Sequence, residues 1–161
     1  MERVNLILRH PQFVEALRRN EELERGRVYC GHGMGHILDT ARIAYVLSLE
    51  NDQNSGIDKE LIYAAALLHD IGRARQYEDG TPHEIESAAI AEKVLPECGF
   101  NGQKTELIID AILSHRTRGD GGDKKGVAGV LYRADKLSRR CFDCGARGDC
   151  DWELKNARLE Y

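Results

Sequence analysis

The feature that most constrains the fold is an apolar stretch, Leu61–Gly72, which reads LIYAAALLHDIG. Its first part, Leu61–Leu68, contains no glycine or proline and is rich in alanine and leucine, which are strong helix formers. A helix that is apolar around its whole circumference belongs in the middle of a bundle. The stretch nevertheless ends in His69 and Asp70, directly before Gly72, which suits a helix stop. Because a carboxylate buried without a partner costs several kcal/mol, Asp70 either emerges into solvent or helps to hold a metal ion.

Length, composition and charge indicate one domain of an ordinary soluble kind. The chain has 161 residues, of which 42% are hydrophobic and 31% charged. Its longest apolar run is far shorter than the roughly 20 residues of a membrane span, and its N-terminus lacks the layout of a signal peptide. A net charge of −4 argues against nucleic acid polymers as partners. We therefore expect a cytoplasmic protein with a single domain over residues 1–161, no membrane partner and a small-molecule ligand; a homo-oligomer is compatible with the sequence.

Apolar periodicity of a helical kind runs through nearly the whole chain, and no stretch alternates with the period of a strand. The pattern predicts an all-α bundle with helices at about 4–10, 13–26, 34–50, 59–71, 82–96, 103–115 and 127–139. Asp58 is a plausible N-cap for the apolar helix, and a polar loop is expected over 73–80. Thr81 and Glu84 are placed for a capping box at the start of the next helix. The end of the chain, 141–161, is expected to be irregular before a short helix through Trp152 and Leu159.

Polar residues of metal-binding type gather at the ends of the predicted helices. Four histidines border or open such helices: His36, His69, His83 and His115. Asp135 lies within an otherwise apolar helix, so it needs a partner for the same reason as Asp70. A single histidine at a helix end is more often a structural group than a ligand. It is the combination of residues that favours a metal site.

These residues resemble the signature of a known family. His36, the motif His69-Asp70-Ile71-Gly72 and the Asp135 of Ala134-Asp135-Lys136 are similar to the H…HD…D pattern of the HD-domain (HDIG-type) metal-dependent phosphohydrolase superfamily. The resemblance covers about residues 30–140. It implies a compact orthogonal helical bundle with a metal at its centre, on which the cysteine-containing tail, 141–161, packs.

The resemblance also implies one or two metal ions. The first would be held by His36, His69, Asp70 and Asp135, with Asp70 able to bridge. His83 and His115 match the additional histidines of binuclear members; alternatively, His83 only caps its helix and His115 binds a phosphate. A mixed imidazole and carboxylate ligand set suits Mn, Fe, Co, Ni or Zn better than Mg.

The implied activity is hydrolysis of a phosphoester or phosphoanhydride of a small molecule, a nucleotide above all, by a metal-activated water. Asp70, Arg73 and Lys136 are expected to be catalytic, the two cations because each adjoins a ligand. Substrate binding is expected from Arg116, Arg118 and Arg139, with Lys124 and Lys125 as a basic lip and 119–122 as a closing loop. Two alternatives remain open at this point: a mixed-valent di-iron HD oxygenase, and a catalytically silent module that senses a nucleotide.

Cysteines near the C-terminus depart from the HD pattern. Five cysteines is an odd number, which favours reduced thiols or metal ligands over a disulfide framework. Cys141 and Cys144 form a Cys-x₂-Cys pair, and Cys150 follows. Such a set indicates zinc or an iron–sulfur cluster more than a disulfide, with ordinary reduced thiols as the alternative. Cys98 is expected to be a small core residue.

A fourth ligand is needed to complete such a cysteine site. Cys30 lies six residues before His36, just as Cys141 lies six residues after Asp135. If His36 and Asp135 converge on one metal, Cys30 and Cys141 are also expected to be neighbours. His32 is the substitute for Cys30.

Overall fold

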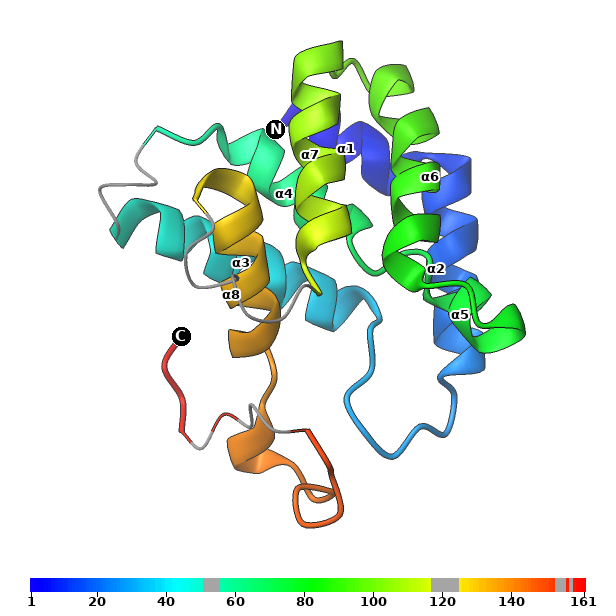
Figure 1. The fold of residues 1–161 in the computed structure, drawn as a ribbon, viewed down its shortest axis with the longest axis vertical. Coiled ribbons are helices and arrows are strands. Elements are labelled where there is room, and N and C mark those ends of the chain that lie inside the picture. The colour runs from blue at the N-terminus through cyan, green and yellow to red at the C-terminus, as the bar shows by residue number, and fades with distance from the viewer. Residues whose placement is uncertain (51–55, 117–124, 153–155, 157) are drawn as a thin grey trace.

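The structure is a computed structural model, and it describes residues 1–50, 56–116, 125–152, 156 and 158–161. The described residues contain helices and no strand, which confirms the predicted all-α bundle (Figure 1). The seven helices predicted between residues 4 and 139 are present, with ends that differ by a few residues. In chain order the elements are α1 (Glu2–Arg9), α2 (Pro11–Leu23), α3 (Met34–Glu50), α4 (Lys59–Leu68), α5 (Arg73–Asp79), α6 (His83–Glu97), α7 (Gly102–Ser114), α8 (Gly126–Leu137) and the 3₁₀ turn η2 (Cys141–Asp143).

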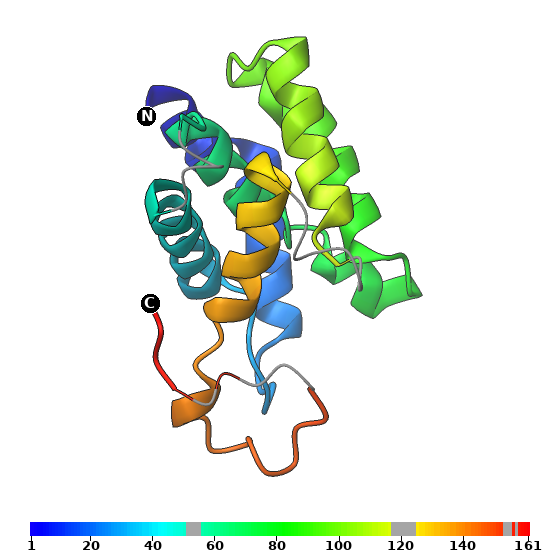
Figure 2. The same cartoon turned by 60° about the vertical axis from the view of Figure 1, so that its left-hand side comes forward.

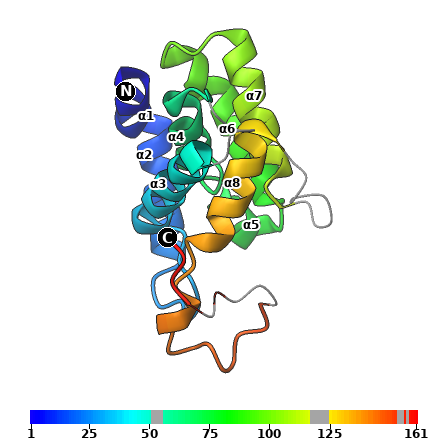
Figure 3. The same cartoon turned by 90° about the vertical axis from the view of Figure 1, so that its left-hand side faces the viewer.

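Helix α4 lies at the centre of the bundle, as its sequence predicts. Every residue from Leu61 to Asp70 except Tyr63 is buried. The side chain of Asp58 accepts a hydrogen bond from the backbone N–H of Glu60 at 2.9 Å, which confirms the predicted N-cap. Helix α4 contacts α1, α3, α6, α7 and α8, so it is covered on several sides (Figures 1 and 3). The C-terminal end of α4 therefore delivers its polar residues into the interior rather than into solvent.

The prediction of a loop over residues 73–80 was wrong. Arg73–Asp79 form helix α5, whose end is marked by Gly80 at a φ of 82°. Its residues, RARQYED, are mostly good helix formers, and Arg75 pairs with Asp79 one turn later at 2.8 Å. The polar composition suits an exposed helix as well as a loop. A segment of seven residues is too short for helical periodicity to distinguish the two.

The predicted capping box before α6 was also wrong. Helix α6 begins at His83, and its N-cap is Pro82, which has no side chain able to cap. Instead, Gln76 of α5 accepts a hydrogen bond from the backbone N–H of His83 at 3.3 Å. A residue of a neighbouring helix thus takes the role that the sequence pattern assigned to Thr81.

Two segments project together beyond one end of the bundle. They are the loop between α2 and α3, residues 24–33, and the chain that follows α8 through η2 (Figure 2). Of the predicted short helix through Trp152 and Leu159, residues 153–155 and 157 lie outside the described residues, and residues 152, 156, 158 and 159 are not helical. Among the described residues, no helix combines the length and the apolar character that a membrane crossing requires.

Candidate metal centre

Six side chains from five helix ends converge in the interior. His36 lies in the first turn of α3 and Asp135 in the last turn of α8, while His69 and His115 are the residues that end α4 and α7. His83 is the first residue of α6, and Asp70 follows His69 in the turn before α5. Five of the six are buried, and His36 is half-buried. The option that Asp70 emerges into solvent is wrong, because its exposed fraction is 0%.

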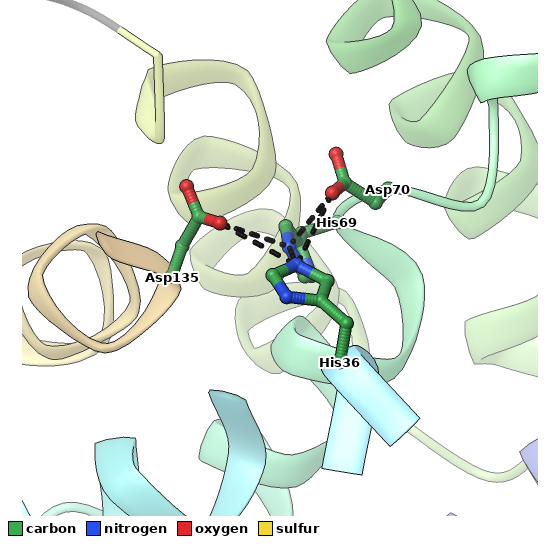
Figure 4. Close-up of side chains that lie close together, drawn as sticks. All are labelled: His36, His69, Asp70 and Asp135. Carbon is green, nitrogen blue, oxygen red and sulfur yellow. Dashed lines mark hydrogen bonds and ion pairs between the residues drawn. The ribbon is translucent and has the colours of Figure 1, made fainter. Parts of the chain in front are cut away.

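The first group consists of His36, His69, Asp70 and Asp135 (Figure 4). The Nε2 atom of His36 lies 3.4 Å from an oxygen of Asp70 and 3.4 Å from an oxygen of Asp135. The Nε2 atom of His69 lies 3.3 Å from the same Asp70 oxygen, Oδ2. All four ligand atoms lie within 4.8 Å of one another, a spacing that a single metal ion can span.

The second group consists of Asp70, His83 and His115. Here the other oxygen of Asp70, Oδ1, lies 2.9 Å from Nε2 of His83 and 3.6 Å from Nε2 of His115. Asp70 thus belongs to both groups and turns one oxygen to each. That is the placement of a carboxylate that bridges two metal ions.

Hydrogen bonds fix the outer nitrogen of two of the rings. Nδ1 of His69 lies 2.7 Å from the carbonyl oxygen of Ala66, and Nδ1 of His115 lies 2.6 Å from that of Ile112. A carbonyl oxygen can only accept, so both Nδ1 atoms carry a proton. In a neutral ring this leaves a bare lone pair on Nε2, which faces the centre.

The other two histidines are held in the same way. Nδ1 of His83 donates to the side-chain oxygen of Gln76 at 2.6 Å. The hydroxyl of Ser138 donates to the carbonyl oxygen of Asp135 at 2.8 Å, so it is free to accept from Nδ1 of His36 at 3.1 Å. Histidines that bind metals almost always donate their other ring N–H to such a partner.

The inner atoms lack partners of their own, and this observation fits a metal. Nε2 of His36 lies 3.4 Å from Nε2 of His69, and Nε2 of His83 lies 3.2 Å from Nε2 of His115. Two lone pairs cannot hydrogen-bond to each other. Neither oxygen of the buried Asp70 side chain has a hydrogen-bond partner among the described residues, although Oδ1 forms an ion pair with Nε of Arg73 at 3.2 Å. Such a set of buried acceptors is stabilised by a cation, and imidazole with carboxylate is a typical ligand set for a transition metal.

Comparison with known proteins agrees with this geometry. A family model described as the HD domain matches residues 33–140. The chain belongs to the HD-domain family. An uncharacterized protein of Clostridium beijerinckii is 43% identical to this HD domain over the full length of both chains.

More distant relatives are larger proteins. Ribonuclease Y of Acetivibrio thermocellus is 30% identical over 80% of this chain but only 21% of its own length. Ribonuclease Y of Enterococcus faecalis is likewise 30% identical, over 22% of its length. The chain thus spans about a fifth of the ribonucleases Y that it matches. No solved structure matches it.

Charges around the centre of this HD domain favour ionised acids and a cation between them. Burial alone would raise the pKa of Asp70, but the charges of His69 and Arg73 hold that pKa well below its usual value. Burial disfavours a charged His69, yet the carboxylates of Asp70 and Asp135 raise its pKa. The pKa of His83 is lowered, chiefly by burial, so that ring stays neutral. Positive charge is therefore favoured between the two acids.

The basic residues predicted from the sequence fall into three sets. Arg73 lies 3.2 Å from Asp70, Arg139 lies 3.4 Å from Asp135, and Lys136 contacts the Asp135 carboxylate directly. Arg116 is half exposed and pairs with Glu84 at 3.4 Å. Arg118, Lys124 and the predicted closing loop, 119–122, lie outside the described residues, and Lys125 is exposed.

Sequence reasoning missed a residue that holds the turn of the His69-Asp70-Ile71-Gly72 motif, here called the HD turn. Asn20 of α2 is 0% exposed, and its amide nitrogen donates to the carbonyl oxygens of Asp70 at 3.0 Å and Ile71 at 3.2 Å. Its oxygen accepts from the N–H of Ala74 at 2.6 Å. The signal was present: Asn20 continues the inward stripe of α2, so a polar side chain was directed into the interior and needed partners.

A cleft beside His36 gives small molecules room next to the centre. Its volume is about 420 Å³, within the range of sites for small molecules and cofactors. His36, Ser138 and Arg139 line it on the side of the metal centre. The opposite wall comes from residues 28–31 and from residues 140 and 143–145, which belong to the two segments that project from the bundle.

Proposed function

We propose that this HD domain is a metal-dependent phosphohydrolase that cleaves a phosphoester or phosphoanhydride of a small phosphorylated molecule, a nucleotide above all. One observation carries the proposal: inward-facing imidazole nitrogens and two buried carboxylates form two adjacent groups that share Asp70. One or two divalent metals of the series Mn, Fe, Co, Ni and Zn fit this donor set. A metal in such a site supplies Lewis-acid activation of water, whose pKa it lowers from about 15.7 towards roughly 7.

The six side chains of the two groups would each have a role in holding the metal ions. His36, His69 and Asp135 would hold the first ion and His83 and His115 the second, with Asp70 as the residue shared by both groups. Their outer hydrogen bonds fix each ring before substrate arrives, which limits reorganisation during the reaction.

Three cations are placed to neutralise a phosphoryl group. Arg73, Lys136 and Arg139 all lie against the two acids, and Arg139 also lines the cleft. Negative charge that develops on phosphoryl oxygens is stabilised by such preorganised cations. Tyr29 lines the opposite wall and is the aromatic residue of the cleft against which a base would stack.

A screen for phosphate release tests this proposal. Metal-stripped protein is reloaded separately with Mn, Fe, Co, Ni, Zn and Mg and offered nucleoside mono-, di- and triphosphates, dinucleoside polyphosphates, simple phosphate monoesters and a short single-stranded RNA. We expect turnover of at least one small phosphorylated compound with a transition metal, and none after chelation.

The remaining outcomes decide against the proposal. Cleavage of the RNA alone would assign a nuclease activity, in keeping with the name of the ribonuclease Y relatives. Consumption of O₂ by the iron form, with an iron-dependent EPR signal, would assign an oxygenase. Tight nucleotide binding without turnover under every metal would assign a sensing module.

A further inference from the structure

Four of the five cysteines come together outside the HD centre, which is the cluster of His36, His69, Asp70, His83, His115 and Asp135. Cys30, from the loop before α3, lines a small pocket with Cys141, Cys144 and Cys150 of the segment after α8. More than a hundred residues separate Cys30 from the other three, so the fold and not local sequence makes them neighbours. The fifth cysteine, Cys98, is buried in the main hydrophobic core. None of the five is part of a disulfide.

The tail turns back on itself in a way that presents its cysteines to the loop. Cys141 begins the 3₁₀ turn η2, after which the N–H of Arg147 bonds to the carbonyl oxygen of Cys144 at 3.1 Å. Asp149 in turn makes a backbone hydrogen bond to Ala146 at 3.2 Å, which returns the chain towards Cys144. Among the described residues of this segment, one hydrogen bond links it directly to the loop, from the Tyr29 hydroxyl to the carbonyl oxygen of Asp149 at 3.4 Å.

We propose that Cys30, Cys141, Cys144 and Cys150 bind one zinc ion, which fastens the C-terminal segment to the loop before α3. A Cys-x₂-Cys pair with two further thiolates is the ligand set of structural zinc sites. The pocket has room for about 10 Å³, close to one water-sized sphere, which suits a single ion. Binding releases the four thiol protons to solvent, since the thiolate is the ligand form.

Charge is consistent with this assignment, and zinc binding requires the four sulfur atoms to move closer together. Four thiolates and one Zn²⁺ leave a net negative charge, and Arg147 lines the same pocket as a counter-charge. In the described part of the chain, the groups whose ligand atoms lie mutually within 4.8 Å are the two of the HD centre. The four sulfur atoms share a pocket without being at coordination distance, so zinc binding draws the two segments inward.

The zinc site would also shape the proposed substrate cleft. Cys30 and Cys144 line both the small pocket and the cleft beside His36. Further along the tail, Trp152 lies under the guanidinium of Arg139 at 4.6 Å, and Asn156 donates to the carbonyl oxygen of Arg139 at 2.7 Å. A tail held by zinc therefore forms one wall of the cleft and keeps Arg139 beside the HD centre. This step rests on the proposed function, but the zinc site itself does not.

Metal analysis of the full-length chain tests the proposal without any activity assay. Wild type is expected to hold one zinc per chain that resists mild chelation and is released when a mercurial reagent modifies its thiols. Cobalt substitution is expected to give an intense thiolate-to-cobalt charge-transfer band, which the HD centre cannot produce because it has no sulfur ligand. Cys144→Ser and Cys150→Ser are each expected to lose this zinc and this band. These two positions are half-buried, so folding is expected to survive.

Cys98→Ala serves as the matched control, because it removes a thiol from the chain without touching the pocket. Its thiol-dependent zinc and its cobalt band are expected to equal those of the wild type. Thiols that react freely in the presence of zinc, a disulfide found by mass spectrometry of the freshly purified protein, or bound iron with inorganic sulfide would each overturn the proposal. Normal zinc with no phosphate release would leave the zinc site standing and count against the proposed function alone.

Discussion

The variant Asp70→Asn is expected to lose both its metal and its turnover. Asp70 is the residue shared by the two ligand groups. Asparagine keeps the shape of this side chain but removes the negative charge that attracts a divalent ion. Loss of residues that only orient metal ligands already costs about 10–100-fold in metal affinity or activity, so we expect a fall of at least about 100-fold in turnover. The measurement is metal content by elemental analysis together with phosphate release on the best substrate of the screen.

Folding must be monitored in the same experiment. Far-ultraviolet circular dichroism is expected to show wild-type helicity, since the side chain retains its volume. Asp110→Asn is the control, because Asp110 is an exposed aspartate on α7 outside both ligand groups. It should retain full metal content and turnover. An Asp70→Asn protein that turns over at the wild-type rate would remove Asp70 from the catalytic centre.

Gly72→Ala is expected to destabilise the fold strongly. A Cβ at Gly72 would lie 2.5 Å from the backbone nitrogen of Ser87, 2.6 Å from the carbonyl oxygen of His83 and 2.7 Å from Cβ of Glu86. Two of these atoms belong to the backbone of α6 and the third is directly attached to it. The steric overlap can therefore be removed only if α6 moves away from the HD turn. The φ of Gly72 is −85°, which alanine adopts readily, so steric overlap and not backbone conformation is responsible. Overpacking of this kind costs about 1–3 kcal/mol and occasionally more, and we expect the upper end of that range.

Urea denaturation measures the loss of stability in Gly72→Ala as a lower midpoint of unfolding. Gly102→Ala is the matched control, since Gly102 opens α7 and a Cβ there would meet nothing within 4 Å. That variant is expected to remain within about 1 kcal/mol of wild type. Equal stability of the Gly72 and Gly102 variants would show that α6 does not pack against the HD turn as described. Because Gly72 donates its N–H to Ser87 and lies beside His83, a displaced α6 is also expected to weaken the second metal group.

The central position of α4 in the bundle could be predicted from its own residues. The run Leu61–Leu68 is too apolar for any position except the middle of a bundle, so the residues that end it either emerge into solvent there or need a buried partner. That argument leads directly to His69 and Asp70, and the same argument applied to α8 leads to Asp135. The approach of His36, His83 and His115 rested on resemblance to a family, because spacing along a chain does not specify how helices pack.

Other features depend on tertiary contacts that leave little trace in the sequence. Helix α5 is too short for its periodicity to be recognised, and Gln76 replaces the cap that local pattern assigned to Thr81. The need for glycine at position 72 arises from the close approach of α6, whereas the sequence suggested only a helix stop. Asn20 was detectable in principle as a polar residue on a buried stripe, but its partners lie some fifty residues away.

Anomalous diffraction from crystals grown with Mn²⁺ tests the central claim most directly. We expect a peak bounded by Nε2 of His36, Nε2 of His69, Oδ2 of Asp70 and a carboxylate oxygen of Asp135, with a second peak on the side of His83 and His115 when both sites fill. The absence of any peak among these atoms in crystals saturated in turn with Mn²⁺, Co²⁺ and Zn²⁺ would contradict the account.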